Sequence, residues 1–592
     1  MSPDTAQTVG LSSGLRPGHV VPTATFEPVT HRPIWFGPDE RPLFGLFHEP
    51  VGGGARYGVV LCPPVGDEER RVYLTYRKLA ESLAAAGHAV LRFSYDGTGD
   101  SAGTMDDPER IGSWTRSIAH AVETMRAVGV PQVAVIGMRL GATLATRAAR
   151  DMECPLDALV LWDPCVTGRE FLRHQQILLT TLSSVPSTAA AGVDTPGYRF
   201  SPELAAELRQ LTLTPVTTPR TRLLVVARPD RPAPERLHRG LGPSSFEELD
   251  AIGQDQLLDV PPLSAVIPWR SIHQITTWIT AGAPPAAPIR PPGRPEATVS
   301  NDAAGRPIRE RAVRFGAIGL FAITTTPEDG GSGPWMMFVN VATEHHIGPG
   351  RLWVDLARDW AGHGIRSVRF DLSGVGDSPV HPAQPENLAY APEWLDDLPA
   401  LASGVSPEDP SDVVLIGLCS GGYGAIESGM VLGARGAFVF NPALSGDIMN
   451  KPADADPRRR ACRPLPAALA KLARNHGRTA WWIWRSYRQF AVWQAPMAVL
   501  ASAVRSGLDV LVICGEDDMR PLREVLFWRL FRERRLRRTG RFELALVPTM
   551  DHVLLVSEGR RVATRLLTAH VLDRFASVGR CADGEGEAGT GR

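Results

Sequence analysis

The chain has 592 residues, of which 43% are hydrophobic and 21% charged, and this composition predicts a folded protein with two large domains. The formal net charge is −1, which excludes an overall field that would attract nucleic acid or an anionic membrane. Seven cysteines are too few for a disulfide framework in a chain of this length. None of them stand in a C-x-x-C pair, so we expect neither a metal nor a cofactor.

The sequence also carries a prediction about location. The first residues show no basic and apolar signal pattern, and no stretch approaches the ~20 apolar residues that a membrane-spanning helix needs. We therefore expect a cytoplasmic protein without a transmembrane segment. In that reducing compartment the cysteines would remain free thiols. Nothing in the sequence predicts an oligomeric state.

Three segments are predicted to lie outside the domains. Residues 1–30 mix Ser, Thr, Pro and Gly without periodicity, and residues 579–592 are rich in Gly, Ala and acidic residues, so both are predicted to be disordered. Residues 281–307 are rich in proline and alanine, which is typical of a semi-rigid linker. The rest of the chain divides into two domains, at 31–280 and 308–578.

Apolar strand patterns alternate with helical patterns along the first domain. The run 59–62 (VVLC) is followed by a helical stretch at 76–87 and by 91–101 (LRFSYDGTGDS), which ends in a Gly-Asp-Ser turn. The next apolar run, 133–136 (VAVI), leads into 137–141 (GMRLG). This alternation predicts an α/β fold with a mostly parallel sheet and helices on both faces.

The second domain repeats these landmarks in the same order. The run 336–339 (MMFV) is followed by a helical stretch at 352–364 and by 368–378 (VRFDLSGVGDS). Residues 413–416 (VVLI) then lead into 417–422 (GLCSGG). The spacing between matching positions changes little along the two halves, so we interpret them as a tandem duplication of one domain.

Both halves contain the strand, sharp turn and helix pattern of a nucleophile elbow, G-x-Nuc-x-G. The central residue is Cys419 in the second half and Arg139 in the first. A thiolate can attack a carbonyl carbon, whereas a guanidinium cannot. The two elbows therefore predict one working site beside one catalytically empty copy.

The second half also supplies an acid and a base in the order that such a site needs. The apolar run 511–514 (LVIC) precedes Gly-Glu-Asp-Asp, where the spacing selects Asp518 and leaves Asp517 as the alternative. The run 544–548 delivers His552. An adjacent imidazole stabilises a thiolate, and a carboxylate behind it fixes the imidazole tautomer. Cys419, His552 and Asp518 are thus predicted as nucleophile, base and orienting acid.

Backbone N–H groups beside the nucleophile are predicted to bind the oxyanion. The N–H of Ser420 is one donor, and the loop after Asn340, at Val341 or Ala342, would supply the other. His345 and His346 follow this loop and could line the site, or they could be ordinary loop histidines. Two alternatives to the thiol nucleophile stay open, namely that Cys419 is an inert buried side chain and that Ser420 attacks instead.

The corresponding positions of the first half lack this chemistry. Asp230 is retained at the acid position, after the run 223–226 (LLVV). Ala265 stands where His552 stands in the second half. With Arg139 at the elbow, the first half has neither a nucleophile nor a base, so we interpret it as a degenerate domain that docks against the second domain, shapes its entrance or binds a partner.

The elbow, the Gly-Asp-Ser turn and the late acid and histidine resemble the α/β-hydrolase superfamily. More closely, both halves resemble the small α/β-hydrolases associated with exosortase and polysaccharide gene systems. The stretches that carry this likeness are 62–64 (CPP), 87–92 (GHAVLR), 162–164 (WDP), Asn340, 348–351 (GPGR) and 369–374 (RFDLSG). The resemblance implies two tandem α/β-hydrolase domains, each with a helical lid insert. That family has serine in the elbow, so this chain departs from it at the nucleophile.

A cysteine elbow resembles three uses of the fold. Dienelactone hydrolases carry G-x-C-x-G-G and open a lactone, whereas polyhydroxyalkanoate synthases and bile-acid acyltransferases move acyl groups from CoA thioesters. The resemblance implies an acyl-enzyme and an acyltransferase, thioesterase or esterase that acts in a biosynthetic pathway on an ester or acyl thioester, which CoA or a carrier protein could carry. The alternative is a non-catalytic tandem pseudo-hydrolase that binds a carrier or a biosynthetic partner.

Two segments near the predicted site bear on its substrate. The stretch 481–493 is aromatic with helical spacing and lies where α/β-hydrolases carry a lid, so Trp484 and Tyr487 are predicted to contact an apolar substrate. A helix packed on the core, or one lying on a membrane surface, is the alternative. Residues 520–541 contain nine arginines that could bind CoA phosphates or an acidic carrier surface, or could form a solvated helix face.

Overall fold

The computed structural model describes most of the chain between residues 30 and 576. The described residues are 30–183, 185, 192–216, 220–230, 234–242, 245–260, 264–444, 499–523 and 533–576. The predicted disordered ends therefore fall almost wholly outside the described residues, as do Trp484, Tyr487 and the aromatic stretch around them. The arginine-rich stretch 520–541 is described only in part.

The first half folds around an eight-stranded sheet with the order β1-β2-β5-β4-β6-β7-β10-β11. Strands β1, β2 and β5 pair antiparallel at one edge, and the remaining pairs are parallel. Its strands are β1 (His31–Phe36), β2 (Leu43–His48), β4 (Gly58–Cys62), β5 (Ala89–Phe93), β6 (Val133–Met138), β7 (Ala158–Trp162), β10 (Arg222–Ala227) and β11 (Glu247–Asp250).

Helices cover both faces of this sheet because successive side chains of the buried strands point to opposite sides. In β4, Val60 and Cys62 pack with helices α2 (Arg110–Val128) and α3 (Leu140–Asp151). Val59 and Leu61 pack on the other face, with α1 (Asp67–Ala85), α7 (Gln254–Leu258) and α8 (Trp269–Ala281). Between β7 and β10 the chain inserts α4 (Gly168–Leu182), the hairpin β8 (Val193–Thr195) and β9 (Tyr198–Phe200), and α5 (Pro202–Gln210).

The second half repeats this strand order behind one additional edge strand. Its nine-stranded sheet runs β13-β14-β15-β17-β16-β18-β19-β20-β21, and only the pairs from β13 to β17 are antiparallel. Its strands are β13 (Glu296–Asn301), β14 (Pro307–Phe315), β15 (Leu320–Pro327), β16 (Ser332–Phe338), β17 (Ile365–Phe370), β18 (Val413–Leu418), β19 (Gly436–Phe440), β20 (Asp509–Cys514) and β21 (Phe542–Leu546).

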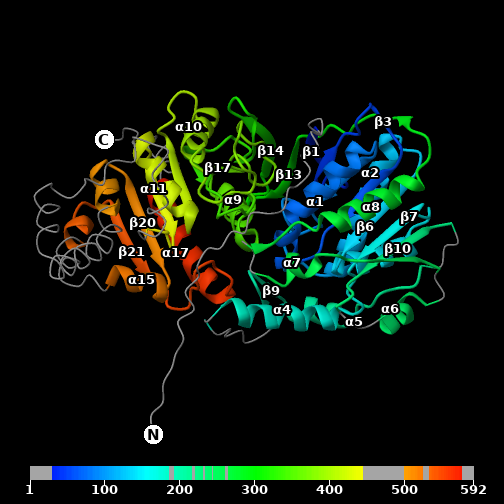
Figure 1. Cartoon of the computed structure of the whole chain (residues 1–592). Helices are drawn as coiled ribbons and strands as arrows, with labels where there is room; N and C mark the ends of the chain where they lie inside the picture. The colour runs from blue at the N-terminus through cyan, green and yellow to red at the C-terminus, as the bar shows by residue number, and fades with distance from the viewer. Residues whose placement is uncertain are drawn as a thin grey trace, which may run out of the picture.

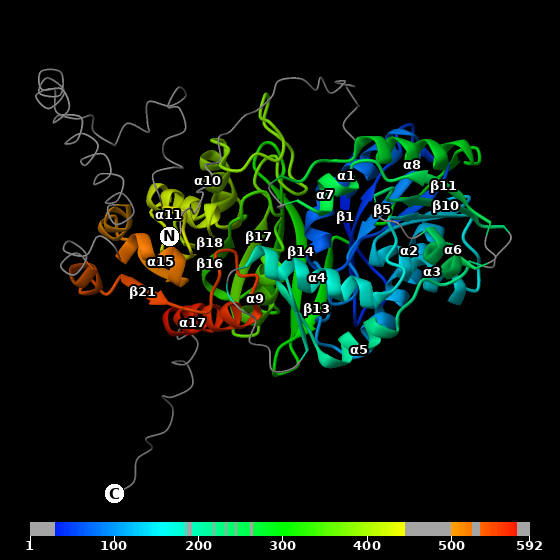
Figure 2. The same cartoon turned by 60° about the horizontal axis from the view of Figure 1, so that its bottom comes forward.

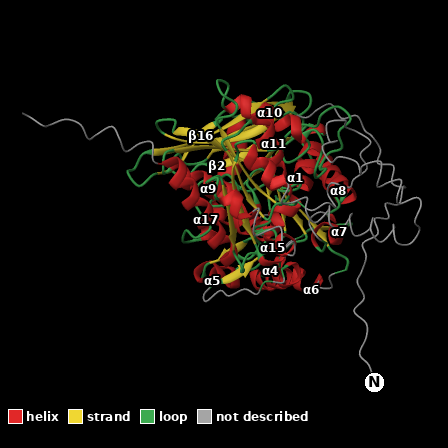
Figure 3. Cartoon of the chain, turned by 90° about the vertical axis from the view of Figure 1, so that its left-hand side faces the viewer, coloured by secondary structure: helices red, strands yellow, loops and turns green. Residues whose placement is uncertain are grey.

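Helices cover this second sheet on both faces as well (Figure 3). Helices α10 (Trp394–Val405) and α11 (Ser420–Leu432) pack on one face. Helices α9 (Leu352–Ala361) and α17 (Ser557–Phe575) pack on the other. The helix α15 (Glu516–Arg523) follows β20. The predicted α/β class is confirmed, with two sheet-rich regions whose parallel strands are flanked by helices.

The two halves lie side by side and meet along the antiparallel edges of their sheets (Figure 1). There β1 and β13 are neighbours, and the backbone N–H of Trp35 donates to the carbonyl of Arg294 at 2.7 Å. A hydrophobic cluster joins Trp35 and Phe44 of the first half to Val299 and Phe321 of the second. The halves therefore share a continuous buried interface.

Part of the predicted linker 281–307 is taken up by strands. Residues Ala287–Pro288 form β12, which pairs with β3 (Gly54–Ala55) of the first half. β13 then joins the second sheet, because Ala297 and Val299 alternate with polar residues and bury their side chains against that sheet. No helix in the described part of the chain is long and apolar enough to cross a lipid bilayer.

Candidate active site

The second elbow forms a sharp turn between β18 and α11. Cys419 sits at φ 53° and ψ −114°, a strained conformation for a residue with a side chain. The turn closes tightly because glycines flank it: a Cβ on Gly417 would lie 2.2 Å from the carbonyl oxygen of Gly421, and one on Gly421 would lie 2.4 Å from that of Asn340. The thiol is thereby presented at the end of the sheet and at the N-terminus of α11.

The structure brings Cys419, His552 and Asp518 together. Nε2 of His552 lies 3.2 Å from Sγ of Cys419, and its Nδ1 lies 2.7 Å from Oδ1 of Asp518. These three residues come from the ends of three different segments, after β18, after β21 and in α15. The side chain of His552 is 48% exposed, so a substrate can reach this line of atoms.

The surroundings of His552 favour its protonated form. The hydrogen bond to Asp518, and next the hydrogen bond to Cys419, raise the pKa of His552 to about 10. A charged imidazolium beside the sulfur is the partner that a thiolate needs. The backbone of the histidine is held as well, because Nδ2 of Asn441 donates to the carbonyl of His552 at 2.9 Å.

The predicted oxyanion donors lie beside the thiol. Ser420 is the first residue of α11, and Ala342, at φ 50°, belongs to the loop after β16. The N–H of Ala342 donates to Oγ of Ser420 at 2.7 Å, so this serine hydroxyl occupies one of the two predicted donors. The side chain of Val341 is buried in the core below. An incoming acyl oxygen would accept from the Ser420 hydroxyl or displace it from Ala342.

Tyr390 adds a group that the motifs did not reveal. It lies at φ 59° in the loop before α10, and its phenol is close enough to Cys419 for that side chain to shift the pKa of the phenol. Burial, and next the proximity of Cys419, raise the pKa of Tyr390, so the phenol stays protonated and can donate. No sequence pattern marks this tyrosine, because a loop of irregular backbone delivers it to the thiol.

The structure places His345 and His346 in the interface between the two halves. Both are buried, and the ring of His345 stacks on Tyr73 of the first half. His346 lies between Asp371 of its own half and Asp100 of the first. This placement agrees with the alternative of loop histidines outside the site, because the loop that follows Ala342 turns toward the neighbouring half.

The first elbow has nearly the same backbone conformation as the second, but its central side chain is an arginine in an ion-pair network. Arg139 sits at φ 54° and ψ −123°, and its guanidinium is buried. It lies 3.3 Å from carboxylate oxygens of both Glu68 and Asp163. Nε2 of Gln175 donates to Glu68 at 3.0 Å. An ion-pair network thus fills the space where a substrate carbonyl would have to enter.

The other two positions of the predicted degenerate site are Asp230 and Ala265. The carboxylate of Asp230 accepts from Nε of Arg228 at 3.0 Å. Ala265, at the position of the base, packs against the core cluster behind α8 and offers no titratable group. Among the described residues, no cluster of histidine, cysteine and acidic side chains could hold a metal ion.

One family model is similar to part of the chain. The family model described as serine aminopeptidase, S33, matches residues 60–224, which lie in the half with Arg139. No curated protein matches. Three solved structures are among those to which part of the chain is similar.

A hypothetical protein from Pseudomonas aeruginosa is 16% identical (TM-score 0.32), and the match covers 43% of this chain and 95% of that one. For an esterase of Pyrococcus furiosus the identity is 14%, the TM-score 0.30, and the coverage 43% of this chain and 91% of that one. An α/β serine hydrolase without lid from Xanthomonas campestris is 15% identical (TM-score 0.28), and the match covers 44% of this chain and 99% of that one.

The strand order of both sheets and the family model agree on the fold. An α/β-hydrolase sheet carries its nucleophile on a turn between a parallel strand and a helix, and here both halves have that turn. The chain thus has the fold of the α/β-hydrolase superfamily. Within the matched residues 60–224, Arg139 occupies the elbow position that carries the nucleophile in a serine hydrolase.

Proposed function

We propose that this α/β-hydrolase-fold protein is a cysteine-nucleophile enzyme that forms an acyl-enzyme from an ester or acyl thioester. The observation that carries the proposal is the line of atoms from Sγ of Cys419 through His552 to Asp518, with contacts of 3.2 Å and 2.7 Å. Nucleophile and base stand within hydrogen-bond reach, and a third group orients the base.

The chemistry follows from these positions. The thiolate of Cys419 attacks the carbonyl carbon, and the negative charge on the carbonyl oxygen is stabilised by the N–H of Ser420 and by the loop at Ala342. His552 transfers its proton to the departing alcohol or thiol, which leaves a thioester on Cys419. Asp518 keeps the imidazole in the required tautomer and stabilises its charged form. Tyr390 can donate a hydrogen bond to the sulfur or to the acyl oxygen.

The second step decides between hydrolysis and transfer. The acyl-enzyme is a thioester, which reacts with amines, alcohols and thiols as well as with water. Exchange of one thioester for another is nearly balanced in free energy. A cysteine in the elbow therefore favours acyl transfer or thioester cleavage over plain ester hydrolysis. An acyl group delivered by CoA or by a carrier protein fits this chemistry.

The proposal is tested by intact-mass measurement after incubation with a panel of acyl-CoA thioesters and activated esters. We expect the mass to increase by one acyl group, and digestion to place that group on Cys419. Cys419→Ala should prevent the increase, whereas Cys154→Ala, at an exposed thiol of the first half, should leave it intact. If no substrate of the panel acylates the protein, a non-catalytic role in binding a carrier or biosynthetic partner replaces the enzymatic one.

A further inference from the structure

The loop that bears the predicted oxyanion donors is held by residues of the first half. Arg70 forms an ion pair with Glu344, two residues after Ala342. The ring of Tyr73 stacks on His345 with centroids 3.7 Å apart and planes at 13°. Both Arg70 and Tyr73 lie on α1. One helix of the degenerate half thus contacts two consecutive residues of the oxyanion loop in the other half.

His346 ties the same loop to both halves. Its Nδ1 lies 3.0 Å from Asp371 of the second half, and its Nε2 lies 2.8 Å from Asp100 of the first. Burial alone lowers the pKa of His346, but the two carboxylates outweigh this effect and raise it to about 10. The imidazolium is therefore charged at neutral pH and bridges two carboxylates from different halves.

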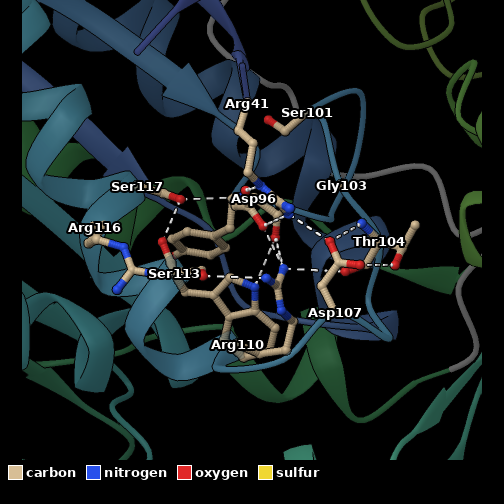
Figure 4. Close-up of polar contacts among 12 residues, drawn as sticks. Arg41, Asp96, Ser101, Gly103, Thr104, Asp107, Arg110, Ser113, Arg116 and Ser117 are labelled. Atoms are coloured by element: carbon tan, nitrogen blue, oxygen red, sulfur yellow. Dashed lines mark hydrogen bonds and ion pairs between the residues drawn. The ribbon is translucent and has the colours of Figure 1, made fainter. Parts of the chain in front are cut away.

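The turn that presents Asp100 is rigid. At its start, Asp96 accepts hydrogen bonds from Arg41 and Arg110, and Asp107 also pairs with Arg41 (Figure 4). Two arginines of the second half bind the backbone of this turn. Arg351 donates to the carbonyl of Gly99 at 2.8 Å, and Arg358 donates to that of Asp100 at 2.6 Å. Asp100 is thus a fixed anchor for His346.

A second contact reaches the segment that follows the catalytic histidine. The N–H of Gly197, between β8 and β9, donates to the carbonyl of Leu555 at 3.0 Å. The hydroxyl of Ser557 donates to Asp194 at 2.7 Å. Leu179 of α4 packs on Leu555 and Val556. Figures 1 and 2 both show α4 beside the red segment that leads into α17. This insert of the first half therefore supports the backbone a few residues beyond His552.

We infer that the first half is a positioning domain, in which Arg70, Tyr73 and Asp100 hold the oxyanion loop of the second half in its reactive geometry. The inference rests on the proposed function and assigns the degenerate half a role in that reaction. Its contacts reach two of the segments on which acylation depends, the oxyanion loop and the chain after His552. The contacts at Glu344 and His345 lie two and three residues after Ala342, so they restrain the part of the loop that carries the predicted donor.

The test compares two reactions of the same thiol in the full chain. Acylation by a thioester passes through an oxyanion, whereas alkylation by iodoacetamide does not, so only acylation depends on the loop. We expect Asp100→Asn and Arg70→Ala to lower kcat for the best acyl thioester by roughly 10-fold to 100-fold, because small displacements of a catalytic loop have effects of this size. KM and the rate of alkylation should stay within about 2-fold of the unsubstituted protein.

Two controls separate positioning from general damage. Arg70→Lys keeps a cation opposite Glu344 and should recover most of the lost kcat. Asp230→Asn changes a carboxylate of the same half that pairs with Arg228, and it should leave kcat unchanged. Circular dichroism and thermal unfolding of each variant would show whether it is folded under the assay conditions.

The possible outcomes are distinct. Unchanged kcat in folded Asp100→Asn and Arg70→Ala would overturn the positioning role and leave the proposed function standing. A parallel loss of kcat and of alkylation would also overturn it, because the effect would then lie on the thiol or on folding. If the unsubstituted protein is never acylated, the proposed function fails, and this inference fails with it.

Discussion

The two nucleophile elbows have nearly the same backbone and opposite chemistry. Arg139 and Cys419 are both forced to positive φ, at 54° and 53°, between flanking glycines. At Cys419 the side chain faces an exposed histidine, whereas at Arg139 it is buried among carboxylates. The first half keeps the strained turn although it has arginine in place of a nucleophile. The packing of strand, glycine and helix therefore determines the backbone of this turn, and the catalytic side chain does not.

The comparison also shows how an empty site can acquire another use. In the first half the charge on Arg139 is neutralised by Glu68, which comes from the same helix, α1, whose Arg70 and Tyr73 reach the other half. Residues around the lost site therefore contribute to stability and to the interface. This difference between the halves can be tested by substitutions that affect one half and spare the other.

The largest expected effect is the loss of turnover in Cys419→Ala. We expect a fall on the order of 10⁴-fold or more, because removal of the nucleophile stops acylation. Ser420→Ala should keep most of the turnover, since the N–H of Ala342 would then be available to the substrate. Steady-state assays of both variants provide the measurement. The opposite pattern would make Ser420 the nucleophile.

The next effect concerns His552→Ala and is measured as the rate of alkylation by iodoacetamide against pH. With its pKa at about 10, His552 is protonated below that pH and keeps a cation beside the sulfur. Without it, the sulfur of Cys419 loses the cation that stabilises its thiolate form. We expect alkylation at pH 7 to slow by roughly 10-fold or more.

The sign of this effect provides its own control. As the pH rises through about 10, His552 loses its proton and the cation disappears, while an ordinary thiol becomes ionised. The two rates should therefore converge at high pH. Equal rates at pH 7 would show that His552 does not activate the thiol, and the assignment of the base would have to be abandoned.

In the first half, Arg139→Ala should act on stability. It leaves Glu68 and Asp163 buried without their guanidinium, and a broken buried ion pair costs about 3–5 kcal/mol of unfolding free energy. The matched change at the other elbow, Cys419→Ala, should cost about 1 kcal/mol. Urea unfolding measures both, and an Arg139→Met/Glu68→Gln double variant should recover part of the loss. Equal costs at the two elbows would contradict the role we assign to the ion pair.

A smaller effect is expected for Tyr390→Phe. This change removes the phenol hydroxyl beside Cys419, and a hydrogen bond from that hydroxyl to a charged group would contribute about 1.5–3 kcal/mol, so kcat/KM should fall by roughly 10-fold to 100-fold. The unfolding free energy should stay nearly constant because the ring is retained. An unchanged kcat/KM would remove Tyr390 from the active site.

The smallest effect is expected for Asp230→Ala, at the acid position of the degenerate half. Its carboxylate pairs with Arg228, and Ala265 stands at the position that a catalytic histidine would take. Turnover should stay within about 2-fold of the unsubstituted protein, provided that folding is unchanged. A strong loss of turnover in the folded variant would mean that the first half is not catalytically empty.

Local sequence patterns were sufficient for the fold class and for the candidate triad. The strands could be predicted because their burial alternates from one residue to the next. The elbow and the order of Cys419, Asp518 and His552 could be predicted because tight turns with flanking glycines depend on neighbouring residues. The choice of Asp518 over Asp517 also came from local spacing, and His552 bonds to Asp518 in the structure. Arg139 and Ala265 alone led to the prediction that the first half lacks a nucleophile and a base.

The positions of residues between these motifs depend on how distant elements pack together. The positions of His345 and His346 depend on contacts with Tyr73 and Asp100, which are far away in the chain. Tyr390 reaches the thiol through an irregular loop whose path no periodicity describes. The same holds for the strand β13 within the proline-rich segment, because only the neighbouring sheet offers a surface on which Ala297 and Val299 are buried. Contacts distant in sequence depend on how whole elements pack, and a local pattern carries no information about that packing.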